Sequence, residues 1–174
     1  MNAPHAPALQ MHLILNVLNR FSLTPGFEPR DHEGIESLAN YLVAVHRLQS
    51  APPGVPLDKL RQAIETYLAL SQWLREEAPP TVEVHSPLQT LRSDASDLAA
   101  RIQLALRDLD GWPLSHVSVS LASAPDALVL QVLLEVTGAA HAVPPSSLEA
   151  RTSWRAAAEA GCMKTEFSAN GQLA

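Results

Sequence analysis

The main change in the spacing of apolar residues comes after about residue 110, and that change most constrains the fold. Up to about residue 110, apolar residues recur three and four positions apart, which is the period of amphipathic helices. From His116 the period becomes two, because Val117, Val119 and Leu121 alternate with small residues. Such alternation is typical of a strand with one face on a core. The sequence therefore predicts an α+β fold with most of its helices before the main strands.

Residues 1–50 are predicted to form a helical hairpin. The first helix spans about residues 7–23, is apolar on more than one side, and stops at Thr24-Pro25-Gly26. Asp31 is the expected N-cap of the second helix, whose apolar residues have the spacing of a helix-bundle core. These residues are Ile35, Leu38, Leu42 and Val45. Because one hairpin cannot bury both sides of the first helix, we expect two chains to pair their hairpins into a four-helix bundle.

Residues 57–174 are predicted to form a second unit, which a proline-rich linker from Ser50 to Pro56 separates from the hairpin. A third helix from Leu57 to Glu77 turns one apolar face inward, and a short strand from Thr81 to His85 follows. The inward residues of that helix are Leu60, Ile64, Tyr67, Leu68 and Leu74.

Ser93 or Asp94 is expected to cap a fourth helix. Its inward residues are Leu98, Ile102, Ala105, Leu106 and Leu109. The alternating segment after His116 and a strand from Leu128 to Val136 predict a hairpin. A fifth helix is expected from about Ser147 to Ala160, closed by Gly161 in a left-handed conformation. A last strand is expected from Met163 to Ser168.

Composition excludes several classes of function. With 47% hydrophobic and 17% charged residues, the chain has the composition of a folded protein, and its net charge of −6 without a Lys/Arg cluster argues against nucleic-acid binding. A single cysteine, Cys162, rules out an internal disulfide and favours a reducing, cytoplasmic compartment. The longest apolar run, Met11 to Leu15, is too short to span a membrane. The histidines have no spacing typical of a metal site, so no metal is expected.

The segment from Met11 to Asn19 contains the candidate site. On a helix, His12, Asn16 and Asn19 form one polar stripe among apolar residues, and Arg20 lies one turn after Asn16. Two interpretations are open. The stripe is the solvated side of a bundle helix, or it presents His12 to a phosphoryl donor, for which an imidazole nitrogen must face solvent.

Two segments resemble the sensor histidine kinases of the autolysis-regulator class. Their phosphoacceptor segment reads roughly Pro-His-Phe-Leu-Phe-Asn-x-Leu-Asn, and Met11 to Asn19 keeps the His, both Asn and the Leu in register. A second motif, roughly Leu-Glu-Glu-Glu-Leu-x-x-Ile-x-x-Tyr-Leu-x-Ile-Glu, is similar to Leu57 through Leu70. The resemblance implies a dimeric helical hairpin followed by an ATP-binding α/β sandwich of the GHKL type. It also implies that His12 is the phosphoacceptor, with Asn16 assisting transfer. From their place on the stripe, Asn19 and Arg20 are expected to face the partner, where Arg20 would attract an acidic group or a phosphoryl oxygen.

The chain departs from this family at the nucleotide site. A GHKL domain needs an Asn for Mg²⁺, an Asp-x-Gly-x-Gly turn and a glycine-rich lid. No Asn occurs between Asn40 and Asn170, the corresponding turn reads Val136-Thr137-Gly138-Ala139-Ala140, and Gly138 is the only glycine between Trp112 and Ala160. We therefore expect a degenerate, small sandwich that does not bind ATP, and no cofactor.

The leading hypothesis is a histidine phosphotransfer protein, or pseudo-histidine kinase, in a two-component phosphorelay. Its expected partners are a second copy of the chain and a receiver domain or histidine kinase, with no nucleic acid and no membrane. Whether the protein is an enzyme stays open, because two alternatives remain. One is a non-catalytic dimeric adaptor that binds a kinase or response regulator, with His12 as a relic. The other is a true kinase with a diverged nucleotide pocket.

Overall fold

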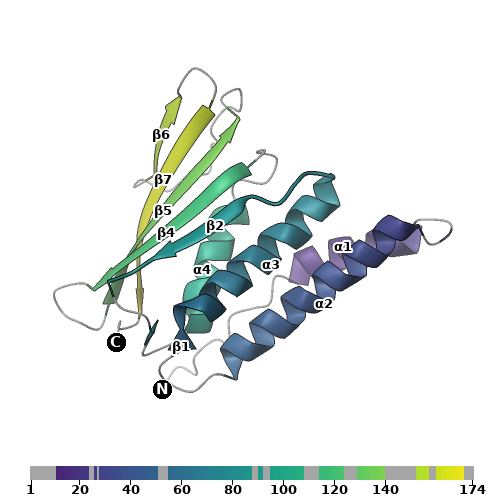
Figure 1. Cartoon of the computed structure of the whole chain (residues 1–174), viewed down its shortest axis with the longest axis horizontal. Helices are drawn as coiled ribbons and strands as arrows, with labels where there is room; N and C mark the ends of the chain where they lie inside the picture. The colour runs from purple at the N-terminus through teal and green to yellow at the C-terminus, as the bar shows by residue number, and fades with distance from the viewer. Residues whose placement is uncertain are drawn as a thin grey trace.

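The computed structural model has the α+β fold that the apolar spacing predicts. The structure describes residues 11–23, 26, 28–50, 55–87, 90–91, 95–107, 114–123, 129–139, 152–156 and 160–170. A five-stranded sheet forms one side of the molecule, α3 lies between the sheet and α2, and α1 lies beyond α3 beside α2 (Figure 1). None of the described helices combines the length and the apolar character that crossing a bilayer requires.

The helices begin and end where the local chemistry requires. Their bounds are α1 Met11–Leu23, α2 Pro29–Gln49, α3 Leu57–Arg75 and α4 Ala95–Arg107. Pro29 occupies the first turn of α2, where its missing N–H costs nothing. Asp31, the predicted N-cap, instead lies at the third helical position: its carboxylate accepts a hydrogen bond from the Glu28 backbone N–H at 2.9 Å, and Glu28 is the N-cap. The helix therefore starts three residues earlier than predicted, because Pro29 and a capping box define its first turn.

The sheet has the strand order β2-β4-β5-β7-β6. Its strands are β2 Thr81–His85, β4 Leu114–Ser123, β5 Val129–Ala139, β6 Thr152–Ala156 and β7 Ala160–Asn170. β2 pairs with β4 in parallel, and the other neighbours are antiparallel. A separate pair joins β1 Val55–Pro56 to β3 Thr90–Leu91. The predicted strand over Thr81 to His85 and the β4–β5 hairpin are confirmed, although β5 runs three residues past the predicted end at Val136.

One hydrophobic core extends from the helices into the sheet. The predicted inward faces are largely confirmed. Of the five inward residues predicted in α3, four are buried and Leu74 is half-buried. In α4, Leu98, Ile102 and Leu106 are buried and Ala105 is half-buried. Leu109 lies outside the described residues, as do Ser93 and Asp94. From the sheet, the alternating residues Val117, Val119, Leu121, Val132 and Val136 complete this core.

The predicted fifth helix is wrong over the part that the structure describes. Thr152–Ala156 forms the edge strand β6, and Gly161 lies inside β7, opposite Gly138 and Ala156, instead of closing a helix. The alanine-rich composition of this segment favours a helix locally, but pairing with the long strand β7 satisfies the backbone groups along one edge of β6. The last strand, predicted over Met163 to Ser168, is confirmed within β7.

Candidate functional site

Helix α1 has one buried side and one exposed side, and the predicted stripe begins on the exposed side. Leu13 and Val17 are buried in the core, whereas Asn16 and Asn19 are exposed. His12 lies in α1 one turn before Asn16. The side chain of His12 itself lies outside the described part of the structure, so its role stays a prediction. Asn16 and Asn19 are the part of the predicted polar stripe whose side chains the structure describes, and both are exposed.

Large apolar side chains are exposed on α1 beside this stripe, and others are exposed on α2. Leu15 and Leu18 of α1 are 51% and 46% exposed, and Ile35, Leu42 and Val43 of α2 are 43%, 40% and 47% exposed. The residues that α2 buries are others, Tyr41, Ala44 and Leu48 among them. Ile35 and Leu42, two of the predicted bundle-core positions, are therefore available to a partner of the hairpin.

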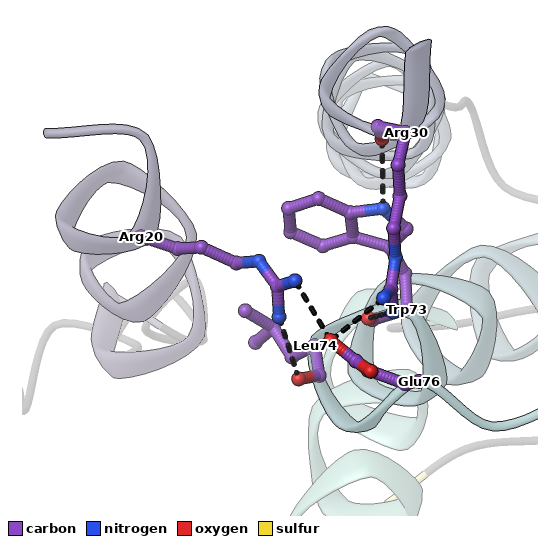
Figure 2. Close-up of polar contacts among 5 residues, drawn as sticks. All are labelled: Arg20, Arg30, Trp73, Leu74 and Glu76. Carbon is purple, nitrogen blue, oxygen red and sulfur yellow. Dashed lines mark hydrogen bonds and ion pairs between the residues drawn. The ribbon is translucent and has the colours of Figure 1, made fainter. Parts of the chain in front are cut away.

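Arg20 does not continue the stripe outward. It follows Val17 by three positions and Leu13 by seven, which brings it to the edge of the buried side of α1. Its guanidinium donates to the Leu74 carbonyl oxygen at 3.2 Å and to Glu76 Oε1 at 3.0 Å, and its Cζ lies 4.9 Å from the centre of the Trp73 ring (Figure 2). Arg20 is thus held at the end of α3, and its predicted contact with a partner stays a prediction.

These contacts belong to a three-helix junction formed by Arg20 from α1, Arg30 from α2, and Trp73, Leu74 and Glu76 at the end of α3. The Trp73 indole N–H donates to the Arg30 carbonyl oxygen, and the Arg30 guanidinium donates to the Trp73 carbonyl oxygen, each at 3.0 Å. Arg30 also contacts Glu76 Oε1 at 2.6 Å, so two guanidinium groups meet one carboxylate oxygen (Figure 2). The junction joins the end of α1 and the start of α2 to the end of α3.

Glu76 has an unusual backbone and an unusual charge environment. Its φ of 65° places it in the left-handed region directly after α3. The hydrogen bond from Arg20, together with the positive charge of Arg30, holds the pKa of the Glu76 carboxyl below its ordinary value of 4.5. The sequence reasoning missed Glu76 and Arg30, because neither belongs to a motif and their meeting depends on how three helices cross.

Gly34 was also missed, although a glycine inside a helical pattern is a recognisable sign of close packing. It is buried in α2, and the Trp73 ring occupies the space where a side chain would begin. Trp73 also contacts Phe21 of α1, with ring centroids 5.5 Å apart. The indole therefore fits between α1 and α2 only because position 34 has no Cβ.

The segment expected to correspond to the nucleotide-binding turn forms a strand up to Ala139. Gly138 lies in β5, in register with Leu114 of β4 on one side and Gly161 of β7 on the other. β5 is paired along both edges here, and its register with β4 shifts between Leu114 and His116, opposite Gly138 and Thr137. Ala140, the last residue of the expected turn, lies outside the described residues.

The described histidines do not assemble a metal centre. On β2 and β4, His85 Nε2 lies 3.1 Å from Glu83 Oε2, and His116 Nε2 lies 4.0 Å from the same atom. Within the described ranges, no group of three or more His, Cys, Asp or Glu residues is arranged to hold a metal ion. The pair of histidines around Glu83 is an exposed polar contact on the open face of the sheet.

Comparison with known proteins gives distant structural matches. No family model and no curated protein matches the sequence. Among solved structures, the Acinetobacter baumannii histidine kinase AdeS has 7% identity and a TM-score of 0.42, over 91% of this chain and 93% of that one. The histidine kinase domain of the blue-light activated histidine kinase from Erythrobacter litoralis EL346 has 11% identity and a TM-score of 0.46, over 90% and 82% of the two chains.

A histidine kinase from Burkholderia phymatum STM815 has 13% identity and a TM-score of 0.37, over 95% of this chain and 88% of that one. At TM-scores of 0.37–0.46, such likenesses transfer neither an activity nor a partner to this chain.

Proposed function

We propose that this protein is a histidine phosphotransfer protein, or pseudo-histidine kinase, of a two-component phosphorelay, with His12 as the phosphoacceptor and without ATP as donor. The observation that carries the proposal is the polarity of α1. Leu13 and Val17 anchor one side of the helix in the core, while Asn16 and Asn19 are exposed on the other. The spacing of His12, Asn16 and Asn19 assigns His12 to that same polar stripe.

The proposed reaction is a transfer between an acyl phosphate and an imidazole. The unprotonated ring nitrogen of His12 attacks the phosphorus of a receiver's phosphoaspartate in line. A nitrogen–phosphorus bond forms, the phosphorus–oxygen bond to the aspartyl carboxylate breaks, and the carboxylate leaves with the electron pair. Asn16, one turn away, has an amide that can donate a hydrogen bond to a phosphoryl oxygen. The reverse reaction passes the group to a second receiver.

The path of β5 supports a relay over an ATP-dependent kinase. The chain forms a doubly paired strand through Gly138 where a GHKL domain needs a turn that approaches phosphates. The sequence there also lacks the Asp of that turn. A phosphoryl group on His12 therefore has to come from another protein, such as a receiver domain or a kinase.

The exposed apolar residues of the hairpin support a second copy of the chain as a partner. In the single chain, five large apolar side chains of the hairpin are exposed to water: Leu15 and Leu18 on α1, and Ile35, Leu42 and Val43 on α2. Pairing two hairpins into a four-helix bundle removes such a surface from water.

The proposal is tested by incubating the protein with a receiver domain that carries labelled phosphoaspartate. We expect wild type to take up label that acid removes, as from phosphohistidine, and His12→Ala to take up none. The control is His46→Ala, which removes an exposed histidine from α2. Equal labelling of wild type and His12→Ala refutes the assignment. Receiver binding by both proteins without any labelling supports the adaptor function instead.

A further inference from the structure

The end of α1 opposite to His12 is held by charge as well as by packing. Arg20 reaches the last turn of α3 through two hydrogen bonds, to the Leu74 carbonyl and to Glu76, and lies over the Trp73 ring. Figure 2 shows the guanidinium groups of Arg20 and Arg30 converging on Glu76 from different helices. One carboxylate therefore connects α1, α2 and the end of α3.

Because Glu76 is exposed, its carboxylate can be removed by substitution without opening the core. Its side chain is 60% exposed, whereas those of Arg20 and Arg30 are 29% and 33% exposed. Without the carboxylate, the two guanidinium groups would lose the negative charge that both now contact, and like charges repel. Arg20 would then lose a charge-assisted hydrogen bond and gain a repulsive neighbour.

Position and orientation of His12 depend on the same helix. Arg20 follows His12 by eight residues, which corresponds to about 12 Å along α1 at 1.5 Å per residue. A helix of this length behaves as a rod, so a movement at Arg20 changes where the other end points. Phosphoryl transfer requires in-line geometry, and a displacement of about 1 Å can reduce a rate by about 10²-fold.

We propose that Glu76 is a positioning residue: through Arg20 and Arg30 it fixes α1 against the end of α3, and thereby fixes where His12 meets its phosphoryl donor. The part that concerns His12 rests on the proposed function, whereas the fixing of α1 does not. Loss of the carboxylate loosens α1 while the core around α4 and the sheet stays intact.

Two variants of Glu76 separate this role from stability in general. Glu76→Gln removes the charge and keeps the size of the side chain. Glu76→Gly also removes the charge, but it relieves the left-handed backbone, where φ is 65°. Glu65→Gln is the matched control, because Glu65 is an exposed carboxylate on α3 that pairs with Arg61 at 3.6 Å, within the same helix.

The experiment is amide hydrogen exchange on the full chain, followed separately for residues 11–23 and 95–107. We expect exchange in α1 to be several-fold faster in both Glu76 variants than in wild type or Glu65→Gln, with α4 unchanged. High salt should accelerate α1 exchange in wild type and not in Glu76→Gln, because salt screens exposed ion pairs. Unchanged α1 exchange, or equal acceleration in α4, overturns the proposal.

Phosphoryl uptake from the labelled receiver supplies the second measurement. We expect Glu76→Gly to be labelled several-fold more slowly than Glu65→Gln. Faster α1 exchange with an unchanged labelling rate overturns the positioning of His12. If wild type is not labelled at all, the proposed function fails, and hydrogen exchange still decides whether Glu76 fixes α1.

Discussion

Gly34→Ala is the smallest change that should disturb the three-helix junction. A Cβ at position 34 would overlap Cζ2 of Trp73 and would lie 2.5 Å from both Cε2 and Cη2. These atoms belong to a rigid ring whose N–H is bonded to the Arg30 carbonyl at 3.0 Å, and whose residue is only 7% exposed. The ring therefore cannot move aside without breaking a contact, and α2 cannot move outward without opening the core.

The expected cost follows from three effects. Adding a methyl group to a packed site costs about 1–3 kcal/mol. Displacing the indole would also lose its hydrogen bond, at a net cost of about 0.5–1.5 kcal/mol. Alanine is a better helix former than glycine by up to about 1 kcal/mol, which opposes the first two effects. The clash outweighs the propensity, and we expect Gly34→Ala to be less stable by about 1–3 kcal/mol.

Urea unfolding, followed by circular dichroism at one fixed protein concentration, measures this difference. Asn40→Ala is the control, because Asn40 is exposed on the same helix and alanine there improves propensity without a clash. In a double-mutant cycle with Trp73→Leu, adding the methyl should cost much less once the ring is absent. A Gly34→Ala protein as stable as wild type, or a cycle without coupling, would refute the packing argument.

Two further predictions concern the surface of the hairpin and the charge at the junction. Leu42→Lys should shift the protein from dimer to monomer in light scattering at micromolar concentration. Leu104→Lys should not, because Leu104 is a comparably exposed leucine on α4, outside the hairpin. A wild-type monomer contradicts the proposed bundle. Because the pKa of Glu76 is lowered in the folded state, its ion contacts stabilise the fold above the ordinary value of 4.5 and are lost as pH falls through the folded pKa. The stability difference between wild type and Glu76→Gln should therefore be present at pH 7 and disappear in acid, and a difference independent of pH would contradict this assignment.

The local spacing of apolar residues was sufficient to predict the helices and strands that have one apolar side and one polar side. The burial of Leu98, Ile102 and Leu106 in α4, and of Val117, Val119 and Leu121 in β4, follows from their periods of 3.6 and 2. The same patterning failed for the segment before Gly161, where alanines favour a helix but pairing with β7 produces β6. A strand's partner is distant in sequence, so local propensity has no information about it.

The polar stripe of α1 was also readable in advance, because a histidine and two asparagines at helical spacing lie on one side of any helix. The behaviour of Arg20 was not. Continuing the stripe by one turn predicts an exposed arginine, whereas the crossing of α1 over the end of α3 places it beside Trp73 and Glu76. A helical wheel gives the angle of a side chain around its own axis, and it does not give the position of the neighbouring helix.

The sequence by itself determined which residues avoid water, where most helices and strands lie, and that His12 and Asn16 share one side of α1. Only the tertiary structure decided that Arg20, Arg30 and Glu76 meet, that Gly34 makes room for an indole, and that Gly138 lies within a paired strand. The physical reason is the range of the forces. Burial and the hydrogen bonds within a helix follow the local period of the sequence. Strand pairing, ion pairs and ring packing depend on atoms that come together only when separate elements pack.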